Sequence, residues 1–169
     1  MKKWNTILEK CHQMMIVIYG RENKMSVLSE QAVVKFSEGY NCAQAVLSSF
    51  SEKYGMKQND AYKIATGLGG GIRCGEACGA VTGGVLVIGL KYGNSTQEEG
   101  NTKMLCYQKT TEFTGIFTKR NGSIVCRELL DCNIGEPEKM KLATDLGLFK
   151  KVCPKMIKDA VEILEELGY

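Results

Sequence analysis

The stretch ACGAVTGGVLVIGLKYG occupies residues 77–93 and decides the fold. Its apolar run, 79–90, is about a dozen residues long, whereas a membrane-spanning helix needs about 20. The stretch contains no proline, and Gly93 follows it as a typical helix end. It therefore predicts a buried core helix over 77–92 and no membrane span.

Glycines are unusually frequent inside this predicted helix, at Gly79, Gly83, Gly84 and Gly89. Each costs roughly 1 kcal/mol relative to alanine, so a close approach must offset the cost. Gly75, Gly79 and Gly83 recur every four residues and leave one side of the helix as bare backbone. Gly79 and Gly83 are therefore candidates for contact with a cofactor, and a tight crossing with another helix is the alternative.

Apolar residues spaced by three and four predict helices on both sides of this stretch. Asn41 is a candidate cap for one of them, and Pro154 is expected to open the last. The other predicted helices span 4–19, 27–37, 42–54, 60–65, 102–119, 124–130 after a Ser123 cap, and 137 to about 149–152. Because no stretch alternates with period two for long, the fold class is all-α, a single-domain bundle of about seven to nine helices.

The 169 residues suit one domain, with 1–24 as an appended N-terminal amphipathic helix and 25–169 as the helical domain. Met25 is an alternative translation start to Met1. If the apolar stripe of the first helix faces solvent, it indicates a homodimer or another partner contact.

Charge and composition exclude several classes of protein. The 22 basic and 19 acidic residues are well mixed, so nucleic-acid binding is not expected. The glycine cluster at 67–71 lacks the Gly-Lys-Ser/Thr of a phosphate-binding loop. The apolar run after the first lysines is too short for a secretory leader, and we expect a cytoplasmic protein. The single histidine, His12, means that any bound metal must be held mainly by sulfur.

In a reducing compartment, eight cysteines indicate reactive thiols or metal ligands more than disulfides. Four of them lie at or near predicted helix starts: Cys42, Cys78, Cys126 and Cys153. The partial positive charge of a helix start can lower a thiol pKa towards neutrality and favour a nucleophile, a redox centre or a metal ligand. The alternative is that these thiols pack as small hydrophobic groups. The remaining four, Cys11, Cys74, Cys106 and Cys132, are resolving thiols, ligands of a second site or structural residues.

The segments around the first four cysteines resemble, in order, the C_GCAxxG_C_C family of small redox-active proteins. The matching segments are EGYNCAQAV at 38–46, GGG at 69–71, CGAVTGG at 78–84, SIVCRELL at 123–130 and CP at 153–154. The resemblance extends from about residue 25 to the C-terminus and places the family's four motif cysteines on Cys42, Cys78, Cys126 and Cys153. The family is similar also to part of split-Soret cytochrome c. In this chain Cys11-His12 lacks the first cysteine of a haem-attachment motif, so covalent haem is not expected.

Four functional hypotheses follow. The first is an iron–sulfur cluster held by the four motif cysteines, in an oxidoreductase or electron-transfer component with a redox partner. The intervals of 36, 48 and 27 residues lack local Cys-x-x-Cys pairs, so such ligands would meet only in the folded bundle. The second is cofactor-free thiol–disulfide exchange, the third a structural four-cysteine zinc site, and the fourth simple packing. The resemblance favours redox activity over zinc.

Overall fold

The computed structural model describes residues 26–96 and 101–169. These residues form eight α-helices and no strand, which confirms the all-α prediction. The helices are α2 (Val27–Ser37), α3 (Cys42–Phe50), α4 (Gln58–Ala65), α5 (Gly79–Tyr92), α6 (Thr102–Asn121), α7 (Cys126–Leu129), α8 (Pro137–Asp145) and α9 (Leu148–Glu166). The predicted helix over 4–19 lies outside the described residues.

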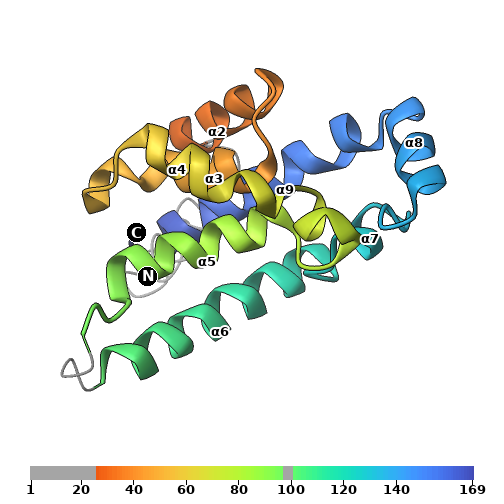
Figure 1. Ribbon diagram of the computed structural model, residues 1–169. Helices are drawn as coiled ribbons and strands as arrows, with labels where there is room; N and C mark the ends of the chain where they lie inside the picture. The colour runs from red at the N-terminus through yellow and green to blue at the C-terminus, as the bar shows by residue number, and fades with distance from the viewer. Residues whose placement is uncertain (1–25, 97–100) are drawn as a thin grey trace, which may run out of the picture.

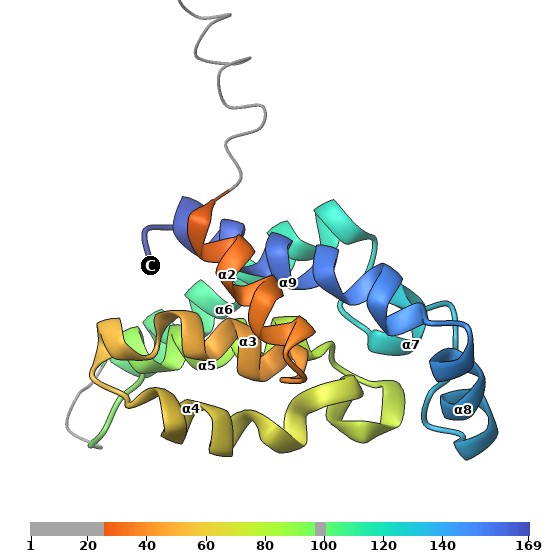
Figure 2. The ribbon, with the colours of Figure 1, turned by 90° about the horizontal axis from the view of Figure 1, so that it is seen from above.

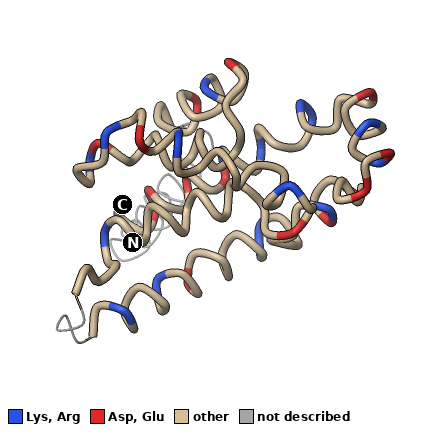
Figure 3. The backbone as a smooth tube through the Cα atoms, viewed as in Figure 1, with Lys and Arg blue, Asp and Glu red and all other residues tan. Residues whose placement is uncertain are grey.

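Helix α5 runs through the middle of the bundle, as the apolar stretch predicts. Figure 1 shows α3 on one side of it and α6 on the other. Helix α9 also contacts α5, and Figure 2 shows α2 lying across α3 and α9. Val87 and Ile88 of α5 are fully buried with Phe113 and Phe117 of α6. No helix among the described residues is both long and apolar enough to span a membrane. Lysine and arginine are interspersed with acidic residues along the helices (Figure 3).

The crossing of α3 and α5 depends on a glycine. A Cβ added to Gly83 would lie 2.8 Å from the Ala43 carbonyl oxygen and 3.0 Å from the Ala43 Cα. The two backbones therefore touch at this point, and Ala43 is fully buried there. The close approach of α3 explains why residue 83 is a glycine, in agreement with the alternative of a tight helix crossing.

Helix α3 begins where its cap predicts. The Asn41 side-chain oxygen accepts hydrogen bonds from the backbone N–H groups of Ala43 and Gln44, both at 3.0 Å. The Gln44 side-chain oxygen accepts from the Asn41 N–H at 2.8 Å, which completes a capping box. Asn41 also donates to the Thr66 carbonyl at 2.9 Å, so the start of α3 is tied to the end of α4. The helix ends at Phe50, earlier than the predicted 54, because residues 52–54 form a 3₁₀ turn.

The prediction that Pro154 opens the last helix is wrong. Helix α9 begins at Leu148, directly after Gly147 in the left-handed region (φ 64°), and Pro154 lies inside it. A proline there leaves the carbonyl of the preceding turn without its partner, a cost of about 3 kcal/mol. The apolar stripe of α9, which includes the fully buried Ile157, Ala160 and Val161, offsets that cost. The predicted helix from 137 is also shorter than expected. Helix α8 ends at Asp145, because the left-handed Gly147 separates it from α9.

Candidate cysteine site

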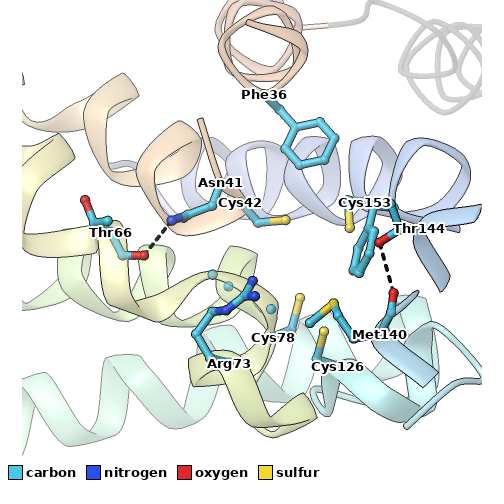
Figure 4. Close-up of a pocket in the computed structure, with 14 residues that line it drawn as sticks. Phe36, Asn41, Cys42, Thr66, Arg73, Cys78, Cys126, Met140, Thr144 and Cys153 are labelled. Carbon is cyan, nitrogen blue, oxygen red and sulfur yellow. Dashed lines mark hydrogen bonds between the residues drawn. The ribbon is translucent and has the colours of Figure 1, made fainter. Parts of the chain in front are cut away.

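The four motif cysteines line one cavity of about 370 Å³. Its walls come from α2, α3, α5, α7, α8 and α9 and from the glycine-rich segment before α5. In Figure 4 the sulfurs of Cys42 and Cys153 point into it from one side and those of Cys78 and Cys126 from the other. The other lining residues are Phe36, Asn41, Thr66, Gly69, Gly70, Arg73, Gly79, Met140, Thr144 and Phe149.

Burial separates these four cysteines from the others. Each is at most 7 % exposed. Cys74 is exposed, Cys106 and Cys132 are half-buried, and none of these three lines the cavity. Cys11 lies outside the described residues. The fold thus brings together four cysteines that are far apart in the sequence.

Local structure fixes three of these thiols at helix starts. Cys42 is the first residue of α3, Cys78 immediately precedes α5, and Cys126 is the first residue of α7. Two backbone hydrogen bonds join the last two segments: the Cys78 N–H donates to the Ile124 carbonyl at 2.8 Å, and the Cys126 N–H donates to the Glu76 carbonyl at 2.6 Å. Ser123 does not cap α7; its hydroxyl accepts from the Val125 N–H, one residue before that helix.

The fourth thiol departs from the prediction. Because α9 begins at Leu148, Cys153 lies in the second turn of a helix and not at its start. Its side chain reaches the cavity because it shares the inner face of α9 with the buried Met156 and Ile157. The argument from helix starts therefore applies to three cysteines only.

Burial and one hydrogen bond between thiols set the ionisation of the four cysteines. Burial raises the pKa of Cys78 to about 11, although backbone N–H groups of Ala80 and Val81 oppose the shift. It also raises the pKa of Cys126 to about 12. Hydrogen bonding to Cys153, followed by burial, raises the pKa of Cys42, and the same interaction lowers the pKa of Cys153. The expectation that helix starts lower the thiol pKa is thus reversed at three positions. Desolvation disfavours the thiolate of Cys78 and Cys126, whereas at Cys42 the hydrogen bond with Cys153 contributes most and desolvation adds to it.

These shifts predict which thiol reacts first. A thiolate is the attacking form, so Cys153 is expected to react with iodoacetamide at least about tenfold faster than Cys126 at pH 8. Its rate should reach half its maximum at a lower pH than that of an ordinary thiol. Mass spectrometry of each cysteine-containing peptide after timed reaction measures the rates. Cys42→Ala removes the hydrogen-bond partner and should shift the Cys153 midpoint upwards; coincident midpoints for both thiols in the unmodified chain would contradict the assignment.

Four thiols are the donor set of either an iron–sulfur cluster or a structural zinc ion. Among the described residues, no group of three or more His, Cys, Asp or Glu side chains is arranged to hold one metal ion. A structural zinc site needs four sulfurs at about 2.3 Å from a common point. Iron–sulfur clusters also take four cysteine thiolates, but the ligands surround a body of several atoms. The four buried thiols that line the cavity supply the four-cysteine donor set that both kinds of site require.

Comparison with known protein families identifies the chain. Residues 40–167 match the family described as "Putative redox-active protein (C_GCAxxG_C_C)", and the match includes all four cavity cysteines. The chain belongs to the C_GCAxxG_C_C family. Comparison with curated proteins and with solved structures finds no match. As a C_GCAxxG_C_C protein, the chain is one of a redox-active, cysteine-containing family, and the expected resemblance is confirmed.

The sequence alone did not single out several residues of the cavity. Phe36, Met140 and Phe149 are ordinary members of apolar helical stripes, and nothing in their spacing indicates a cavity. Arg73 is different, because it follows the glycine cluster closely. An isolated cation after successive glycines was the available signal.

Proposed function

We propose that this C_GCAxxG_C_C protein carries an iron–sulfur cluster on Cys42, Cys78, Cys126 and Cys153 and exchanges electrons with a redox partner. The supporting observation is that four buried thiols, three within α3, α7 and α9 and one directly before α5, line a single cavity. When bound, such a cluster supplies one-electron transfer. Among the described residues, the cavity lining includes no His, Asp or Glu, and the Met140 thioether is its soft donor besides the four thiols.

The protein's own residues would control loading. Cys42, Cys78 and Cys126 are protonated at neutral pH because their pKa values are raised, so ligation must release their protons. Loading is therefore expected to become more favourable as the pH rises. The backbone N–H groups of Ala80 and Val81 hydrogen-bond to the Cys78 sulfur and stabilise negative charge there.

A second candidate is thiol–disulfide exchange between Cys42 and Cys153. Their mutual hydrogen bonding and the lowered pKa of Cys153 support it, since the more acidic thiol is the natural attacking group. In that reaction the Cys153 thiolate attacks a partner disulfide, and Cys42 then displaces the partner thiol. The two cysteines are oxidised to a disulfide and the partner is reduced to two thiols. Cys78 and Cys126 have no role in this scheme, which makes it the weaker account of four converging thiols.

Anaerobic purification followed by a visible spectrum and by iron, zinc and thiol analysis separates these functions. A brown protein with roughly 2–4 iron atoms per chain supports the cluster. A colourless, metal-free protein whose Cys42 and Cys153 oxidise reversibly supports exchange. About one zinc per chain would contradict both proposals.

A further inference from the structure

Among the described residues, Arg73 is the one charged side chain that lines the cavity. Within residues 26–96 and 101–169, Arg73 makes no ion pair or side-chain hydrogen bond. The other two arginines of this part of the chain are paired, Arg120 with Glu166 and Arg127 with Glu76. Arg73 is exposed to solvent and lines the cavity beside the four buried thiols without an acidic partner among the described residues.

The backbone directs Arg73 towards the cavity. Four successive residues, Gly70 to Arg73, have φ values between 57° and 62°. This left-handed conformation is unfavourable for Ile72 and Arg73, which have side chains, and such residues are common at ligand sites. The turn is closed by a hydrogen bond from the Glu76 N–H to the Gly71 carbonyl at 3.0 Å. A Cβ on Gly70 would lie 3.5 Å from Arg73 Nη1, so the guanidinium folds back over Gly70, and Figure 4 shows it reaching into the cavity.

The surroundings of Arg73 also favour an anion. Helices α3 and α5 both begin at the cavity, where Cys42 and Gly79 are their first residues. Their N-terminal ends contribute partial positive charge. Phe36, Met140 and Phe149 supply an apolar wall. The pocket therefore combines a free guanidinium with space for a small organic body.

We propose that Arg73 forms an anion subsite in the thiol cavity and binds the carboxylate or oxyanion group of a small ligand next to the four cysteines. A guanidinium recognises both groups through paired N–H donors. The proposed anion subsite depends on the proposed redox function in one respect: its ligand would lie beside the redox centre. Its test uses reduced, metal-free protein, so the subsite and the cluster can fail separately.

Two alkylating reagents of similar size test the subsite. Iodoacetate carries a carboxylate, whereas iodoacetamide carries a neutral amide. With either reagent, the thiolate sulfur bonds to the methylene carbon, and iodide leaves with the electron pair of the broken carbon–iodine bond. The ratio of the two rates at each cavity cysteine cancels differences in thiolate fraction. The quantity compared is the rate with iodoacetate divided by the rate with iodoacetamide, taken relative to the same quotient at Cys106 outside the cavity. It is expected to fall about 3- to 5-fold in Arg73→Gln, the size typical of a partly exposed ion pair.

Two further variants control for charge and fold. Lys63→Gln removes one positive charge from an exposed position of α4 outside the cavity and should leave the ratio unchanged. Arg73→Lys keeps the charge and should retain more of the ratio than Arg73→Gln. An unchanged ratio in Arg73→Gln, or an equal fall of both rates, overturns the proposal, because Arg73 would then act only on thiol ionisation or not at all.

Inorganic phosphate provides an independent probe that does not require reactive thiols. At constant ionic strength, phosphate is expected to cause saturable amide NMR shifts at residues 70–74 of the wild-type chain and none in Arg73→Gln. The wild-type protein suffices if the variant does not fold. The absence of saturable shifts in the wild type overturns the proposal.

Discussion

The Cys78→Ser variant is expected to retain at least about tenfold less iron than the wild-type protein after anaerobic purification. Cys78 is 4 % exposed and enters the cavity at the start of α5. A serine hydroxyl fills nearly the same space but does not ionise to replace the thiolate. Iron and sulfide analysis, together with the visible absorbance, measure the loss.

Cys74→Ser is the matched control for this experiment. Cys74 lies four residues earlier, is exposed, and does not line the cavity. Its replacement should leave iron content and absorbance at wild-type values. If Cys78→Ser keeps the wild-type spectrum and loses only one titratable thiol, Cys78 is not a ligand.

Gly83→Ala is expected to lower the free energy of unfolding by about 2–3 kcal/mol. The added methyl group would lie 2.8 Å from the Ala43 carbonyl oxygen, and backbone atoms cannot rotate away as a side chain could. The helices must move apart, which also separates Cys42 from Cys78, so iron retention should fall with stability. Urea unfolding followed by circular dichroism gives the free energy.

Gly89→Ala in the same helix isolates the effect of the crossing. A Cβ at Gly89 has no heavy atom within 4 Å. Alanine there should stabilise the protein by about 0.5–1 kcal/mol through its higher helix propensity. Equal stabilities for the two variants would show that the crossing of α3 and α5 does not depend on Gly83.

Local signals explain which parts of the fold were predictable. Helix α2 was predicted with the observed bounds, and α3 begins where Asn41 predicts, because capping and apolar spacing are properties of neighbouring residues. The burial of α5 followed in the same way from its unbroken apolar stretch. The four cysteines were singled out by pattern, but only the tertiary structure brings them to one cavity.

Pro154 and the thiol pKa values required the tertiary structure. Proline at a helix start is the more common arrangement, yet the burial of the α9 stripe outweighs the lost hydrogen bond. Likewise, a helix start favours a thiolate, but its effect is smaller than the desolvation of Cys78 and Cys126. In both cases, long-range burial overrides a local preference.

Cysteine protection is the most direct test that the four thiols form one site. The protein is loaded anaerobically with iron and sulfide, then alkylated at a pH that modifies all seven described cysteines of the metal-free form. Mass spectrometry should show simultaneous protection of Cys42, Cys78, Cys126 and Cys153, while Cys74, Cys106 and Cys132 react as before. Protection of Cys42 and Cys153 alone, or loss of protection from all four, would contradict a single four-cysteine site.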